Sequence, residues 1–100
     1  MTTTIQQTEG KIIAVLSGEL DTAAASATEQ ALQPLLDSKG KDILIDCTSL
    51  EYISSSGLRV LLGILKSANA NGSKVVLKNV NDVIRDVLEL TGFISIFEFE

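Results

Sequence analysis

The stretch from Ile43 to Leu62 constrains the fold more than any other part of the chain. It begins with the apolar run Ile43-Leu44-Ile45, which is typical of a strand covered on both faces, as in a parallel sheet. A polar segment follows, and we expect it to be a loop. An apolar stripe with three- and four-residue spacing then predicts a helix. The members of this stripe are Leu58, Leu61, Leu62, Leu65 and Ala68.

Three consecutive serines, Ser54, Ser55 and Ser56, stand where this helix must begin. A serine there can accept a hydrogen bond from one of the first helical N–H groups, which otherwise lack partners. One serine is enough for such a cap. At least one hydroxyl therefore remains to be explained.

The residues before this stretch predict a hairpin and a helix. Residues 4–8 and 12–16 read as two strands joined by a turn at Glu9-Gly10, and the polar first strand suits a sheet edge. Asp21 or Thr22 can cap the helix that follows. Pro34 should break or kink this helix near residues 30–34, because proline removes one backbone hydrogen bond. Gly40 is expected to end it in the left-handed conformation.

The residues after the stretch repeat the alternation of helix and strand. Asn71-Gly72 should end the serine-led helix, and residues 74–78 form the next strand. Asn81 or Asp82 can cap a third helix that ends at Gly92, and residues 93–100 read as a last strand. The order is then β-β-α-β-α-β-α-β. This order predicts an α/β fold in one domain over residues 1–100, with a mixed, mostly parallel sheet and an N-terminal hairpin.

Composition excludes several classes of function. The net charge of −5 and the absence of a basic run argue against direct nucleic-acid binding. The chain has no histidine, which excludes nucleophile systems that depend on one and removes the commonest transition-metal ligand. The only cysteine, Cys47, cannot form an internal disulfide, and we expect it to pack at a buried strand end.

Hydropathy gives no sign of membrane insertion. No apolar segment approaches the roughly 18 to 20 residues that span a bilayer, and no signal-peptide pattern is seen at the N-terminus. The sequence therefore predicts a cytoplasmic protein.

The segment Tyr52–Leu62, preceded by Ile45-Asp46 and its loop, resembles the signature of STAS domains, a family found in anti-sigma-factor antagonists and in the cytoplasmic tails of sulphate transporters. The resemblance covers nearly the whole chain, and Gly18-Glu19-Leu20-Asp21 is similar to the family's segment after its second strand. In the antagonists the pattern is typically Asp-Ser-Ser-Gly-Leu, and the serine before the glycine is phosphorylated. That serine corresponds to Ser56, while Ser54 stands in the usual aspartate position.

The resemblance also implies which residues meet a partner. Ser56 is the expected phosphorylation site, with Ser55 as the alternative. The expected partner-binding residues are Asp21, Ser54, Ser55, Ser56, Gly57 and Arg59. Each also has a structural interpretation: Asp21 and the serines can cap helices, Gly57 can allow close approach of a neighbouring loop, and Arg59 can be a solvated charge.

The function implied by the resemblance is that of an anti-sigma-factor antagonist. Such a protein binds an anti-sigma serine kinase when unphosphorylated and is released by phosphorylation, with a serine phosphatase as a further candidate partner. The alternative is a constitutive STAS adaptor of a transporter or signalling complex, in which the serines only cap. Neither function is enzymatic, because the chemistry belongs to the kinase, and the sequence predicts no catalytic residue, cofactor or metal site.

Overall fold

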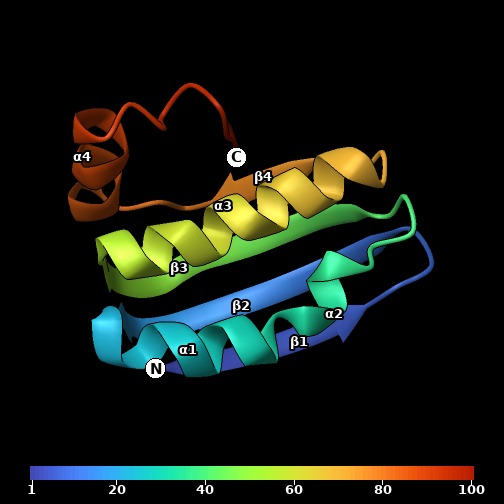
Figure 1. Cartoon of the computed structure of the whole chain (residues 1–100), viewed down its shortest axis with the longest axis horizontal. Coiled ribbons are helices and arrows are strands. Elements are labelled where there is room, and N and C mark those ends of the chain that lie inside the picture. Colours follow the sequence, from blue (N-terminus) through green and yellow to red (C-terminus); the bar gives the residue numbers. More distant parts are fainter.

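A five-stranded mixed sheet forms the centre of the structure, a computed structural model that describes residues 1–100 (Figure 1). The strands are β1 Thr2–Gln7, β2 Lys11–Leu20, β3 Asp42–Ile53, β4 Val75–Lys78 and β5 Glu98–Phe99. They lie in the order β1-β2-β3-β4-β5, with β1 antiparallel to β2 and the other neighbours parallel. The predicted α/β class, the N-terminal hairpin and the edge position of the first strand are therefore confirmed.

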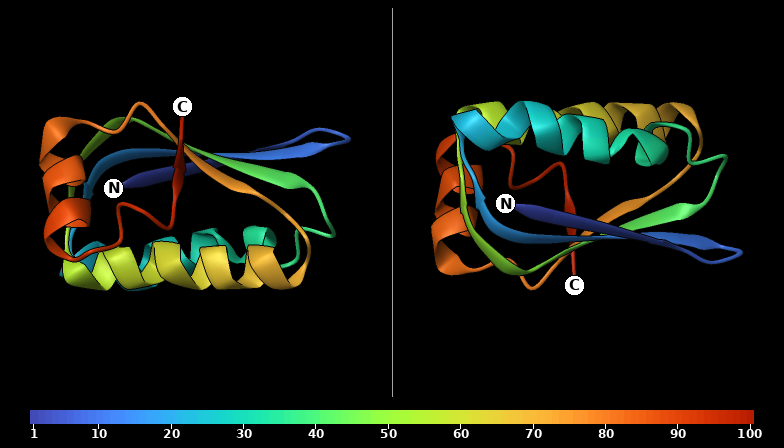
Figure 2. Two further views of the ribbon diagram at one scale, coloured as in Figure 1. Left: turned by 90° about the horizontal axis from the view of Figure 1, so that it is seen from above. Right: turned by 90° about the horizontal axis from the view of Figure 1, so that it is seen from below.

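Four helices complete the domain: α1 Thr22–Ala31, α2 Gln33–Leu36, α3 Ser55–Ala70 and α4 Asp82–Leu90. Figure 2 shows α1 and α3 covering one face of the sheet, while α4 lies across one end. Helices α1 and α2 are separated at Leu32, with Pro34 in the first turn of α2. The predicted break near residues 30–34 is thus confirmed. Proline fits the first turn of α2 because its missing N–H is not needed at a helix start.

The core between the sheet and the helices is mostly aliphatic, with Phe97 as its one buried aromatic side chain. It contains 22 buried apolar residues, including Ile12 and Leu16 of β2, Ile45 of β3 and Leu61 of α3. Cys47 is buried in this core, as predicted, but it lies within β3 and not at a strand end, because β3 continues to Ile53. Burial and the neighbouring Asp46 raise the pKa of its thiol to about 12, so Cys47 packs as a protonated, hydrophobic side chain.

The prediction of a polar loop after Asp46 is wrong, because β3 continues to Ile53. Two irregularities in the pairing of β2 with β3 explain the difference. Between the pairs Val15↔Asp46 and Glu19↔Tyr52, β3 uses two more residues than β2. Bulges of this kind interrupt the alternation of buried and exposed residues, so the strand does not look like one in the sequence. Gly18, at φ +103° beside the second irregularity, supplies a backbone conformation that other residues rarely adopt.

The hydrogen bonds of Asp46 stabilise the first of these irregularities. Its carboxylate accepts hydrogen bonds from the backbone N–H and the hydroxyl of Thr48. These hydrogen bonds, together with the nearby charge of Lys78, lower the pKa of the Asp46 carboxyl. The acidic residue that ends the apolar run therefore shapes the strand and does not end it.

The prediction of a last strand over residues 93–100 is also largely wrong, because β5 contains only Glu98 and Phe99. The N–H groups of Phe93 and Ile94 donate to the carbonyl of Leu88, at 2.9 and 3.1 Å, and so close the end of α4. Only the end of the segment, where the alternation is clearest, joins β4.

Of the three glycines predicted to end helices, two do so and one does not. Gly72 and Gly92 follow the caps of α3 and α4 with φ of +74° and +80°, as predicted. Gly40 also has a positive φ, of +82°, but α2 already ends at Leu36. Gly40 instead lies in a turn closed by a hydrogen bond from Lys41 N–H to the Ser38 carbonyl.

No helix in the structure combines the length and the apolar character that a membrane crossing requires.

Candidate functional site at the start of helix α3

The parallel strands β2 and β3 end side by side, and this brings the predicted site residues to the C-terminal ends of these strands. Leu20, the last residue of β2, pairs with Ile53, the last residue of β3. The N–H of Ser54 then donates to the Leu20 carbonyl at 2.9 Å. Helices α1 and α3 therefore begin next to each other, and their first residues, with Asp21 and Ser54 as caps, lie at the same end of the molecule (Figure 1).

Ser54 is the serine that caps α3. Its hydroxyl oxygen accepts a hydrogen bond from the Gly57 N–H at 3.1 Å, and the side chain is only 8% exposed. The other two serines are the first residues of the helix itself; Ser55 is exposed and Ser56 is half-buried. Neither hydroxyl makes a hydrogen bond within the chain, and the N–H groups of this first turn have no preceding helical carbonyls. Two hydroxyls are thus available at a helix end with positive potential.

This division of roles predicts different effects for three alanine substitutions. Ser54→Ala should lower the free energy of unfolding by about 1 kcal/mol, because the cap is lost. Ser55→Ala and Ser56→Ala should each change it by less than about 0.5 kcal/mol. Urea unfolding followed by circular dichroism measures all three. Equal losses for the three variants would contradict the assignment of Ser54 as the cap.

Gly57 is explained by the packing of α3 on the strand ends. A Cβ atom at this position would lie 2.6 Å from Leu20 Cγ, 2.7 Å from the Leu20 carbonyl oxygen and 3.1 Å from Ile53 Cγ1. Such distances leave no room for a side chain. Gly57 therefore lets the start of α3 sit directly on the paired ends of β2 and β3, and this fixes the position of the serines.

Asp21, and not Thr22, caps α1. Its carboxylate accepts a hydrogen bond from the Ala24 N–H at 2.8 Å. Asp21 also lines a shallow hollow with Glu19 and Glu51. These two glutamates were not predicted as site residues. Glu51 lay in the predicted loop, and only the shifted strand register brings it beside the end of β2. Their charges make this end of the sheet acidic.

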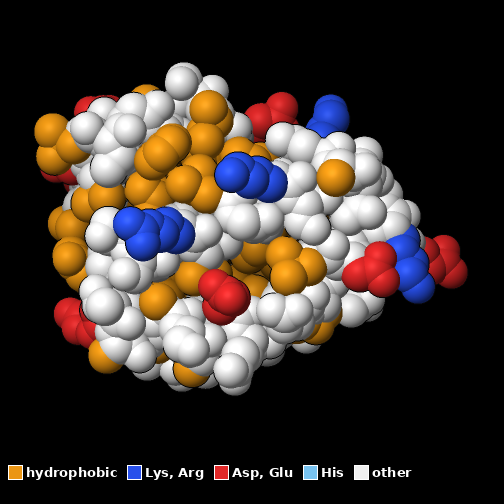
Figure 3. All heavy atoms as spheres, viewed as in Figure 1, with side chains coloured by type: hydrophobic (Ala, Val, Ile, Leu, Met, Phe, Trp, Pro, Cys, Tyr) orange, Lys and Arg blue, Asp and Glu red, His pale blue; other side chains and the backbone are white.

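Arg59 lies further along α3, on the side of the helix that faces α1 and α2. It is exposed and lines a groove of about 220 Å³ whose lining also includes Glu29, Leu32 and Ile64. Figure 3 shows basic side chains over α3 on this face, next to apolar surface. Arg59 thus lines a different hollow from Asp21 and contributes a positive charge one turn into α3.

Exposed apolar side chains at this end, among them Tyr52 and Val83, were not predicted as site residues. Tyr52, beside the end of β3, is 42% exposed, and Val83, in the first turn of α4, is 53% exposed. Asn81 ties α4 to β3: its side-chain amide donates to the Leu50 carbonyl at 2.9 Å and caps the helix by accepting from the Ile84 N–H. Exposed apolar side chains beside polar groups are typical of protein-binding surfaces.

The arrangement suits recognition by another protein. The three carboxylates of the hollow belong to no group of side chains placed to hold a metal ion. What the site offers is a helix N-terminus with free hydroxyls, an acidic hollow beside Asp21 and a basic residue one turn into α3.

Comparisons of the sequence with protein families and with known proteins indicate the same family. The family model described as the STAS domain matches residues 2–100. The chain is 35% identical over 97 residues to BtrV of Bordetella bronchiseptica, a protein named as a candidate anti-sigma factor antagonist; the match covers 97% of this chain and 84% of BtrV. It is 31% identical over 77 residues to the anti-sigma-B factor antagonist of Staphylococcus aureus, covering 77% of this chain and 71% of that protein.

Solved structures show the same fold. The anti-sigma factor antagonist SpoIIAA in its unphosphorylated form superposes with a TM-score of 0.75 at 19% identity, over 99% of this chain and 87% of that one. The phosphorylated form of SpoIIAA, from Bacillus, gives a TM-score of 0.74 at 20% identity, over 99% of this chain and 91% of that one. At this level of identity the likeness concerns the fold.

Proposed function

The chain belongs to the STAS domain family, and because its relatives are named as anti-sigma factor antagonists, we propose that it binds an anti-sigma serine kinase and is released by phosphorylation at Ser56. The observation that carries the proposal is the free, half-buried hydroxyl of Ser56 at the start of α3, directly before Gly57. Ser54 already supplies the cap, so Ser56 is not needed for it. Ser55 is the alternative site.

A phosphate on Ser56 would change the surface more than the fold. It would add about −1.5 to −2 charges at neutral pH. At a helix N-terminus that charge is favoured locally by about 0.3 to 1 kcal/mol, so the domain stays folded. Glu19, Asp21 and Glu51 already make the neighbouring hollow acidic. A partner that fits the unphosphorylated surface would then meet a larger negative charge, and each 1.4 kcal/mol of mismatch weakens binding about tenfold.

The proposed binding surface consists of the start of α3 and its flanks. Ser55 and Arg59 are exposed, Asp21 and Ser56 are half-buried, and Ser54 and Gly57 shape the turn from within. In this function the chain is the substrate of the kinase and not itself an enzyme. A serine phosphatase would restore the unphosphorylated form, and the exchange would take place in the cytoplasm, where sigma factors act.

Phosphosite mapping tests the proposal. The purified protein is incubated with ATP and cell extract from its source, alongside Ser55→Ala and Ser56→Ala, and analysed by mass spectrometry. We expect a single phosphate that is lost only in Ser56→Ala. Loss only in Ser55→Ala would move the site by one residue.

A constitutive adaptor is the second candidate, and the serine at position 54 in place of aspartate favours it. Ser54 occupies the position where the antagonists usually carry aspartate, and here its hydroxyl is used within the chain. If the chain carries no phosphate while a control substrate in the same extract does, the adaptor becomes the better assignment.

A further inference from the structure

The two edges of the sheet differ in how well they are protected against pairing with another strand. The β5 edge is only two residues long, and Glu98 and Glu100 place charges on and beside it. The β1 edge is six residues long, and residues 1–8 contain no charged side chain and no proline. Natural sheets usually shield an exposed edge with charges, prolines or short strands. The β1 edge has none of these devices.

The register of β1 with β2 shows which backbone groups are free. The N–H of Thr8 donates to the Lys11 carbonyl at 2.8 Å, and hydrogen-bonded pairs alternate along an antiparallel ladder. Residues 2, 4 and 6 therefore bond to β2. The N–H and C=O groups of Thr3, Ile5 and Gln7 point away from the sheet and form an open row of donors and acceptors.

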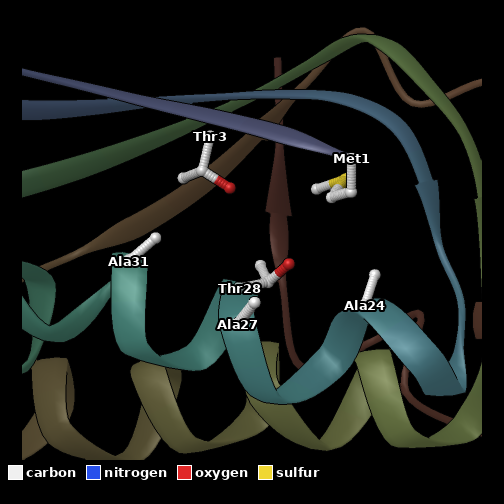
Figure 4. A pocket seen from close by; sticks show the side chains of 6 residues that line it. All are labelled: Met1, Thr3, Ala24, Ala27, Thr28 and Ala31. Atoms are coloured by element: carbon white, nitrogen blue, oxygen red, sulfur yellow. The ribbon is translucent and has the colours of Figure 1, made fainter.

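A groove with a floor of small residues lies beneath this row, between β1 and α1. It has a volume of about 290 Å³. The residues that line it are Met1, Thr3, Ala24, Ala27, Thr28 and Ala31 (Figure 4). Alanine side chains from α1 leave room here for the side chains of an added strand.

Thr28 provides an independent sign that this groove receives a polar group. The residue is only 3% exposed, yet its hydroxyl makes no hydrogen bond within the chain. No fully enclosed polar side-chain atom in the structure lacks a partner, so the Thr28 oxygen must open on the groove. Figure 4 shows this oxygen pointing into the pocket. A nearly buried hydroxyl of this kind gains a hydrogen bond when a polar ligand fills the groove.

We propose that β1 of a second copy of this chain pairs antiparallel with β1 along this edge. In the two-fold register that places Ile5 opposite Ile5 of the second copy, Thr3 stands opposite Gln7 of the second copy. Thr3 and Thr28 line the same groove. The amide of Gln7 from the second copy then supplies the partner that the Thr28 hydroxyl lacks.

The added strand comes from a second copy of this chain, because two β1 edges can meet without bringing like charges together. A chain with a net charge of −5 repels its own copies over most of its surface, but residues 1–8 bring no like charges together. Ile5 is partly buried against the core, and pairing completes its burial. The groove shares Met1 and Ala24 with the acidic hollow beside Asp21, but none of its lining residues belongs to α3, so the pairing does not require phosphorylation at Ser56.

Sedimentation equilibrium over a range of protein concentrations tests the pairing. We expect a concentration-dependent dimer of the wild type. Thr3→Lys, which places a charge in the groove of both copies, should raise the dissociation constant by about tenfold or more. Ser95→Lys is the control, because it adds the same charge at an exposed site away from β1. A wild type that stays monomeric, or a Thr3→Lys variant that dimerises like the wild type, overturns the proposal.

Amide hydrogen exchange locates the interface without any substitution. On raising the concentration, exchange should slow at the N–H groups of Thr3, Ile5 and Gln7, while residues 2, 4 and 6 are already protected in the monomer. Protection that appears elsewhere in a dimer overturns the proposal. Free exchange of these three N–H groups at every concentration also overturns the proposal. The β1 edge would then be open to a strand of another protein.

A double-mutant cycle tests the register. Thr28→Val removes the hydroxyl with little change in shape, and Gln7→Leu removes the amide. Each should raise the dissociation constant, and the double variant should raise it no further than either one alone. Additive effects would show that the two side chains do not meet.

Discussion

Gly57→Ala is expected to lower the free energy of unfolding by about 1 to 3 kcal/mol, although alanine is the better helix former. The added Cβ would lie 2.6 Å from Leu20 Cγ and 2.7 Å from the Leu20 carbonyl oxygen. Neither atom can easily give way. Leu20 is fully buried, and its carbonyl accepts the hydrogen bond from Ser54 N–H that joins the two strand ends. The start of α3 must therefore move away from the sheet.

Gly63→Ala is the matched control in the same helix. A Cβ at Gly63 meets nothing within 4 Å, and the residue is exposed. This variant should be more stable than the wild type, by about 0.5 to 1 kcal/mol, because alanine loses less backbone entropy in a helix. Denaturant unfolding of both variants gives the comparison. A Gly57→Ala variant as stable as Gly63→Ala would show that the close approach to Leu20 is not a packing constraint.

Ser56→Asp is expected to weaken binding to the cognate anti-sigma kinase by about tenfold or more while leaving the domain folded. The substitution adds a permanent negative charge in the first turn of α3, which the helix itself tolerates. The charge adds to those of Glu19, Asp21 and Glu51, which line a hollow at the same end of the sheet. A partner docked over this turn must then desolvate the added charge or oppose it with its own groups. Isothermal titration calorimetry with the purified kinase measures the loss.

Ser55→Asp is the control for position. It adds the same charge to the same helix end, one residue earlier, so both variants change the net charge and the helix electrostatics in the same way. A loss confined to Ser56→Asp supports the switch at Ser56. Equal losses would show a general effect of charge at this turn, and an unchanged affinity of Ser56→Asp would contradict the switch.

Much of the fold follows from the sequence because the signals are local. The apolar stripe of α3, the caps, the break at Pro34 and the stops at Gly72 and Gly92 depend on contacts and backbone preferences within about one helical turn. The STAS resemblance also rests on a contiguous motif, and the match of the family model to residues 2–100 confirms it. For this reason the element order, the mixed sheet and the family could be predicted, while the partner and the phosphorylation site stay predictions.

The tertiary structure decided what depends on pairing between distant segments. The continuation of β3 through its predicted loop rests on its register with β2, about thirty residues away, and the same register brings Glu51 to the site. The choice of Ser54 as the cap and the need for glycine at position 57 depend on Leu20, which touches this turn only after the strands have paired. The open β1 edge and the free Thr28 hydroxyl likewise exist only where α1 folds beneath β1. Local periodicity determined which elements form, because helix and strand patterns repeat within a few residues, whereas the site was decided by hydrogen bonds and close contacts between segments that meet only in the folded chain.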